Sequence, residues 1–101
     1  MTAAITITGK DGKPILYASM NGEHLRFEFE YYARDDTESD YEFSHTVFPA
    51  DFPSISKKFA LLPTIDILLT IQEIQDMGLG QGLKDALTEN EIVNELFVWT
   101  G

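Results

Sequence analysis

Four carboxylates alternate along one stretch of the chain, at Asp36, Glu38, Asp40 and Glu42. Alternating oxygen ligands of this kind open an EF-hand calcium loop, which also needs a glycine at its sharp turn and a glutamate at its twelfth position. Tyr41 stands where the glycine is required and Val47 where the glutamate is required. The pattern therefore predicts no specific calcium site, and we expect no metal and no other cofactor.

Two histidines and a glycine-rich run are the other features that suggest chemistry. His24 and His45 should project from opposite faces of the predicted sheet, which excludes a shared metal ion. We expect a hydrogen bond to satisfy His45 at the edge of the core, and we expect His24 to be exposed beside a turn. The run 78–82 follows a predicted helix and lacks the lysine of a phosphate-binding loop, so we interpret it as a helix stop and a hinge. No catalytic constellation results, and we predict no catalytic residue and no enzymatic activity.

Composition limits the partners. There is no cysteine, which excludes disulfides, cysteine-bound zinc and thiol catalysis. Seven basic residues against 17 acidic ones give a net charge of -10, and this charge repels nucleic acid and anionic membranes. No apolar run is as long as a membrane-spanning helix, which needs about 18 residues. We expect no targeting signal in the first residues. We expect a cytoplasmic protein that binds neither nucleic acid nor membrane.

The negative charge is concentrated between residues 23 and 51, where nine acids accompany two arginines. Such a block fits a solvated surface. It also fits a contact surface for a basic protein, because clustered like charges speed the capture of an oppositely charged partner. Under the second interpretation the binding residues are acids with two aromatic anchors, namely Tyr17, Glu28, Glu30, Tyr32, Asp35, Asp36, Glu38, Asp40 and Glu42.

The elements that position these side chains begin with strands. Residues 3–8, 14–20, 24–33 and 41–48 alternate between apolar and polar side chains, which predicts four strands. Asp11-Gly12 and Asn21-Gly22 separate the first three runs and are typical of two-residue hairpin turns.

These turns fix an expected register. The first hairpin pairs Ile7 with Leu16, and the second pairs Leu16 with Phe27. Both hairpins place the same side chains of the second strand on one face. For the fourth strand we prefer Tyr31 opposite Phe43, because the alternative, with Tyr31 opposite Tyr41, sets two glutamates against each other.

From Pro49 the apolar spacing becomes helical. A short helix is expected from about residue 51 to residue 58 or 61, and a second from a Thr64 cap to residue 77, with Gly78 as its stop. The side chains of the second helix that should face the sheet are Ile67, Leu68, Ile71 and Ile74. A helical turn is expected at 83–87, and a capping box from Thr88 to Glu91 predicts a last helix that ends near residue 98.

Several apolar side chains have no place in this arrangement. Ile65 and Leu69 lie off the stripe that faces the sheet, and the ridges of the predicted last helix include Leu96, Phe97 and Trp99. We interpret these five residues as candidates for self-association, with a homodimer formed through a helical surface.

Four strands followed by helices predict one α+β domain over residues 1–101, with an antiparallel β-β-β-β meander in residues 1–48 and two or three helices on one sheet face in residues 49–101. The leading functional hypothesis is a small acidic, non-enzymatic binding protein, such as an inhibitor, that engages a basic, nucleic-acid-binding protein surface through its acidic sheet face and loop. The alternative is a self-associating structural subunit of a phage or bacterium. Salt distinguishes them, since only the charge-driven complex weakens steeply as ionic strength rises.

Overall fold

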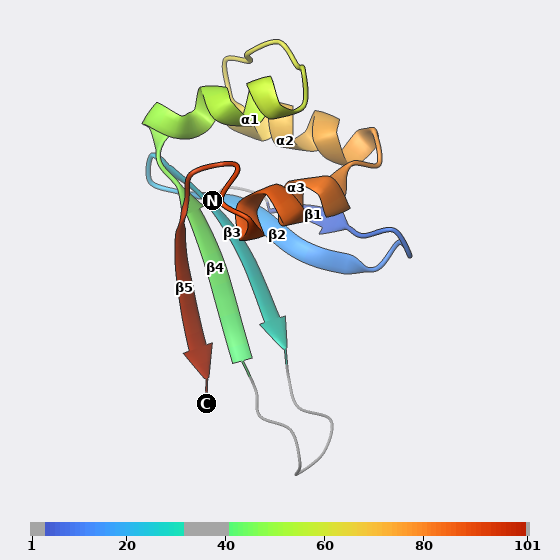
Figure 1. Cartoon of the computed structure of the whole chain (residues 1–101), viewed down its shortest axis with the longest axis vertical. Helices are drawn as coiled ribbons and strands as arrows, with labels where there is room; N and C mark the ends of the chain where they lie inside the picture. The colour runs from blue at the N-terminus through green and yellow to red at the C-terminus, as the bar shows by residue number, and fades with distance from the viewer. Residues whose placement is uncertain (1–3, 32–40, 101) are drawn as a thin grey trace.

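An antiparallel sheet of five strands carries three helices in the computed structural model, which describes residues 4–31 and 41–100 (Figure 1). The strands lie in chain order and are β1 (Ile5–Thr8), β2 (Pro14–Asn21), β3 (His24–Tyr31), β4 (Tyr41–Val47) and β5 (Glu95–Thr100). Between β4 and β5 the chain forms a 3-10 turn, η1 (Pro49–Asp51), and the helices α1 (Phe52–Lys58), α2 (Ile67–Asp76) and α3 (Gly80–Thr88). The α+β class is confirmed, but the predicted four-stranded sheet has a fifth strand.

The fifth strand replaces the predicted last helix. Thr88 is the last residue of α3 and not a cap, and Asn90 takes a positive φ of 58° that ends the helix. The amide of Glu91 donates to the carbonyl of Ala86 at 2.8 Å, which closes the helix end in the manner of a Schellman motif. The following segment is rich in aromatic and β-branched residues, and it pairs with β4 without interruption from Glu95 to Thr100.

The register of the first three strands follows the predicted faces. Ile7 lies opposite Leu16, as expected. Between β2 and β3 the expected pairs are wrong by two residues, since Phe27 lies opposite Ala18. The turn consists of Gly22-Glu23 and not Asn21-Gly22, because Asn21 and His24 are already paired. A shift of two residues leaves every side chain on its predicted face.

The third and fourth strands adopt the register that we considered less favourable. Tyr31 lies opposite Tyr41, Glu30 opposite Glu42 and Phe29 opposite Phe43. The ring centroids of Phe29 and Phe43 lie 5.5 Å apart, and this aromatic contact stabilises the observed register. Glu42 is partly exposed, and water weakens the repulsion between like charges at such a position.

The core lies between the helices and one face of the sheet. The helices α2 and α3 both pack on β1 and β2. The fully buried side chains include Ile7, Leu16 and Phe27 from the sheet with Ile71, Ile74, Leu83 and Leu87 from the helices. The predicted stripe of α2 is confirmed, with Ile67, Ile71 and Ile74 buried and Leu68 partly buried.

The ends of α2 differ at one position from the prediction. Asp66, and not Thr64, caps its first turn by accepting a hydrogen bond from the Leu68 amide at 3.0 Å. Gly78, with φ of 74°, ends the helix as expected. Among the described residues, no helix has the length and apolar character to cross a membrane.

The expected hinge at 78–82 is wrong, because its last three residues form the first turn of α3. Gly80 is buried against β1. A Cβ there would collide with the Thr8 carbonyl oxygen and come within 2.7 Å of Ile7 Cγ2. Gly80 therefore serves close packing between α3 and β1, not flexibility.

The two glycines of this turn predict opposite effects of the same substitution. Gly80→Ala should lower the free energy of unfolding by about 1–3 kcal/mol, because the collision involves backbone that cannot give way cheaply. Gly82→Ala is the control, since its Cβ would meet nothing closer than 3.7 Å. It should leave stability unchanged or raise it by up to about 1 kcal/mol through helix propensity. Urea denaturation measures both, and equal effects would contradict the close approach of α3.

Candidate functional site

The face of the sheet turned away from the helices is the first candidate. Side chains opposite one another in the register form a row across four strands, from Tyr17 in β2 through Glu28 and Ser44 to Phe97 in β5. The two aromatic ends are 41% and 58% exposed. We call the surface formed by Tyr17, Arg26, Glu28, Glu42, Ser44 and Phe97 the outer face.

One arginine offsets part of the charge on the outer face. An Arg26 terminal nitrogen lies 3.6 Å from a Glu28 carboxylate oxygen and 4.0 Å from one of Glu42. About a third of each of these three side chains is exposed, so both ion pairs are in contact with water. Arg26 Nε is buried and has no hydrogen-bond partner within the described chain. The guanidinium therefore holds the two carboxylates beside one another without neutralising both.

The structure brings only part of the predicted binding set together. Tyr17, Glu28 and Glu42 share the outer face, as predicted. The backbone of Glu30 lies opposite Glu42, which assigns its position to the same face. The other predicted binding residues, Tyr32, Asp35, Asp36, Glu38 and Asp40, lie outside the described residues.

The predicted self-association residues fall on separate surfaces. Ile65 is fully exposed in the loop before α2, and Leu69 is exposed on α2 itself. Leu96, Phe97 and Trp99 belong to β5 and not to a helix, which is a correction with a structural consequence. In a strand, neighbouring side chains point to opposite faces, so Leu96 lies on the helix side while Phe97 lies on the outer side.

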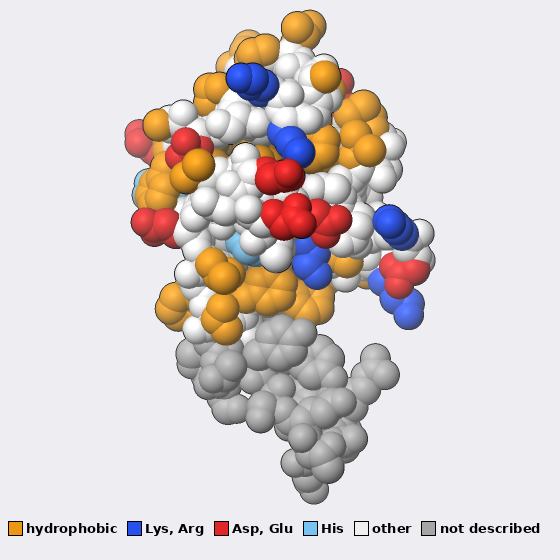
Figure 2. Space-filling model, in the orientation of Figure 1, with side chains coloured by type: hydrophobic (Ala, Val, Ile, Leu, Met, Phe, Trp, Pro, Cys, Tyr) orange, Lys and Arg blue, Asp and Glu red, His pale blue; other side chains and the backbone are white. Residues whose placement is uncertain are grey.

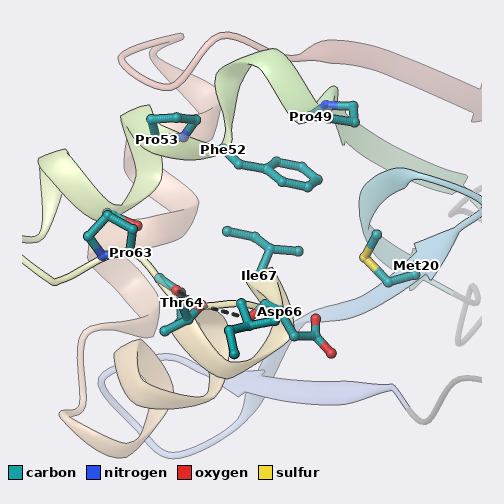
Figure 3. Close-up of a pocket in the computed structure, with 11 residues that line it drawn as sticks. Met20, Pro49, Phe52, Pro53, Pro63, Thr64, Asp66 and Ile67 are labelled. Atoms are coloured by element: carbon teal, nitrogen blue, oxygen red, sulfur yellow. Dashed lines mark hydrogen bonds between the residues drawn. The ribbon is translucent and has the colours of Figure 1, made fainter.

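A cavity of about 530 Å³ opens between α1 and the start of α2 (Figure 3). Phe52, Ile67 and Met20 point into it, with proline rings at its rim. Its polar side chains already have partners, because the Thr64 hydroxyl bonds both the Asp66 carbonyl oxygen and the Thr70 hydroxyl at 2.7 Å. The Asp66 carboxylate is used as the helix cap. Apolar side chains form much of the wall of this cavity.

A second cavity, of about 470 Å³, lies between the end of α3 and strands β4 and β5. Its walls are mainly apolar, from Phe43, Leu87, Leu96 and Val98. The Lys84 amine lies 6.0 Å from the centre of the Phe43 ring. Figure 2 shows hydrophobic side chains gathered over this lower part of the sheet, below the acidic side chains of the helical layer. Strand β5 forms one wall of this cavity. The sequence pattern predicted a helix for this segment and therefore did not reveal the cavity.

His45 is buried beside the second cavity and bonds to Asn94. Its Nδ1 lies 2.8 Å from Asn94 Oδ1. The Asn94 amide nitrogen donates to the carbonyl oxygens of Leu87 and Ile92 at 2.8 and 2.7 Å. Because both amide hydrogens are used, Asn94 Oδ1 must accept, and His45 Nδ1 carries the proton. The predicted hydrogen bond of His45 is confirmed, whereas Asn94 was not foreseen.

His24 lies on the opposite face and is partly buried rather than exposed. Its ring meets Phe48 edge-on at a centroid distance of 4.5 Å. Across residues 4–31 and 41–100, no group of three or more histidine, aspartate or glutamate side chains is placed to hold a metal ion.

Comparison of the chain with models of protein families, with curated proteins and with solved structures found no match.

The His45–Asn94 contact predicts a stability effect. Asn94→Ala should lower the free energy of unfolding by about 2 kcal/mol, because His45 and the Leu87 and Ile92 carbonyls lose their partner together. Asn90→Gly is the comparison: it removes only the long, exposed hydrogen bond of 3.4 Å that Asn90 Oδ1 accepts from the Asn94 amide, and glycine accepts the positive φ of that position. It should change stability by less than about 0.5 kcal/mol. Thermal unfolding followed by circular dichroism compares the two, and a silent Asn94→Ala would contradict the hydrogen-bond network.

Proposed function

We propose that this protein acts by binding and not by catalysis, and that its outer face engages a basic surface of another protein. The observation that carries the proposal is a sheet face that none of the described helices covers. The helices α2 and α3 pack on the opposite face, and Tyr17, Glu28 and Phe97 remain in contact with water in one row. Exposed aromatic side chains next to charges are typical of surfaces that bind proteins.

The charges of the outer face support a basic partner. Two carboxylates face water beside a single arginine, within a chain whose net charge is -10. Such a field raises the rate at which a positively charged protein is captured. The acids of residues 35–40 would add to this field as neighbours in sequence of β3 and β4.

The aromatic ends of the row support a protein partner over a free ion. Tyr17 and Phe97 offer rigid apolar area at a low cost in conformational entropy, which anchors protein interfaces. An arginine or lysine from the partner would find carboxylates and ring faces on one surface. A nucleic acid is not expected to bind directly, because its phosphates would be repelled. A partner whose basic site itself binds nucleic acid would make the protein an inhibitor.

Neutralising the outer face tests the proposal. The double variant Glu28→Gln/Glu42→Gln removes two negative charges from the outer face. The matched control, Glu73→Gln/Glu89→Gln, removes two from exposed positions on the helical layer. Proteins that co-purify with the unmodified protein from its native host would be identified, and association rates measured by surface plasmon resonance at increasing salt. We expect basic partners, an association rate about tenfold lower for the first variant, and no more than a twofold change for the control.

Two results would contradict the proposal. If the control variant slows association as much as the outer-face variant does, then the net charge of the protein, and not the outer face, sets the association rate. A partner that binds equally well at low and high salt would mean that the carboxylates do not contribute. Circular dichroism would verify that both variants fold, since the Arg26 ion pairs are partly exposed and losing them should cost about 1 kcal/mol.

A further inference from the structure

The two edges of the sheet differ in how they are protected. The edge strand β1 has four residues, and its register is broken by a bulge between Ile7 and Thr8. A short, bulged strand is a poor template for another strand. The edge strand β5 has six residues and pairs with β4 without a bulge, so its second edge is long and regular.

The side chains of β5 make this edge apolar on both faces. Leu96 and Val98 lie on the helix side and are 60% and 56% exposed, while Phe97 on the outer side is 58% exposed. Glu95 is the one charged residue of the strand, which contains neither lysine nor proline. Charges, prolines and bulges are the usual means of keeping edge strands apart, and β5 uses almost none of them.

We propose that β5 is a self-association edge: a second copy of this chain pairs its β5 antiparallel to the first across a two-fold axis, and the two sheets become one. The backbone groups on the free edge of a strand are complementary to another strand edge. The occupant must also be apolar on both faces, and β5 of a second copy meets this requirement. An edge that binds itself across a two-fold axis gives a closed dimer, the commonest form of homo-oligomer.

The arrangement of β5 residues fits antiparallel self-pairing. With the axis at Phe97, that residue meets its own copy on the outer side, and Leu96 meets Val98 of the second copy on the helix side. With the axis at Val98, that residue meets its own copy on the helix side, and Phe97 lies opposite residue 99 of the second copy. In both cases the two Glu95 carboxylates are offset by at least about 13 Å along the strands. Parallel pairing in register would bring them together.

Charge opposes contact between two copies. Two copies with net charge -10 repel each other, and β5 brings one acid, Glu95, to the proposed contact. This makes the salt response of the dimer opposite to that of a complex with a basic protein. Added salt screens the repulsion and should strengthen self-association. The dimer would place both outer faces on one side of the joined sheet, but it does not depend on the proposed binding of a basic partner.

Two single lysine variants, each at an exposed apolar position, test whether the β5 edge forms the dimer. Val98→Lys changes β5 on the helix side and leaves Glu28 and Glu42 of the outer face intact. Ile65→Lys is the matched control, with the same change of charge at a fully exposed position on the helical layer. Sedimentation equilibrium over a concentration series should show a monomer–dimer equilibrium for the unmodified protein and for Ile65→Lys. The dissociation constant should rise at least tenfold for Val98→Lys.

Cysteine cross-linking locates the axis. The natural chain has no cysteine, so a single introduced thiol can join only to its copy. Residues opposite each other in an antiparallel pair have Cβ atoms about 4.5–5.5 Å apart, which is close enough for a disulfide to form with small adjustments. Mild oxidation should give covalent dimers with Phe97→Cys or Val98→Cys, whichever lies on the axis. Ile65→Cys should give no covalent dimer.

Three outcomes would overturn the proposal. The first is an unmodified protein that stays monomeric up to its solubility limit at high salt. The second is a dimer broken by Ile65→Lys and not by Val98→Lys, which would assign self-association to the helical layer. The third is cross-linking that is equal at all three cysteine positions. None of these outcomes bears on the salt-sensitive binding of a basic partner, so the two proposals fail separately.

Discussion

The burial of one sheet face under the helices is the constraint on which the remaining features depend. Phe27, Leu16 and Ile7 meet Ile71, Ile74, Leu83 and Leu87 in a layer that excludes water. Removing this much apolar surface from water is the dominant favourable contribution to folding. The chain uses its three helices to cover that face. The outer face and the β5 edge are left without a described element over them.

The uncovered parts are chemically different from each other. The outer face combines carboxylates, an arginine and aromatic rings, and it suits a charged partner. The β5 edge combines unpaired backbone with leucine, phenylalanine and valine, and it suits another strand. One strand contributes to both, because Phe97 lies on the outer face and belongs to the edge. Opposite salt responses separate the two contacts in an experiment.

The sequence predicted the sheet better than it predicted the region after α3. Alternation identified β1 to β4, and the shift of two residues between β2 and β3 left the described side chains of these two strands on their predicted faces. The register of β3 and β4 was predicted incorrectly because charge repulsion was given more weight than the Phe29–Phe43 contact. Gly80 was read as flexible because its close approach to Thr8 depends on tertiary structure.

The β5 strand was missed for a physical reason. Its segment follows a Thr-x-x-Glu pattern that normally starts a helix, and its apolar residues fit helical ridges as well as a strand. What decides its conformation is the open edge of β4 together with the bonds of Asn94 to Leu87, Ile92 and His45. The pairing with β4 and the bond between Asn94 and His45 join residues that are distant in the sequence. The candidate site was therefore predictable on β2 to β4, and its continuation to Phe97 was not.

Photo-cross-linking in cells of the native host tests the central claim most directly. A benzophenone amino acid in place of Tyr17 keeps an aromatic ring on the outer face and captures whatever lies against it. The same amino acid in place of Ile65 reports on the helical layer. The account predicts that position 17 captures a basic protein and that position 65 does not. Capture of the same protein at position 65 alone would contradict the assignment of the outer face as the binding surface.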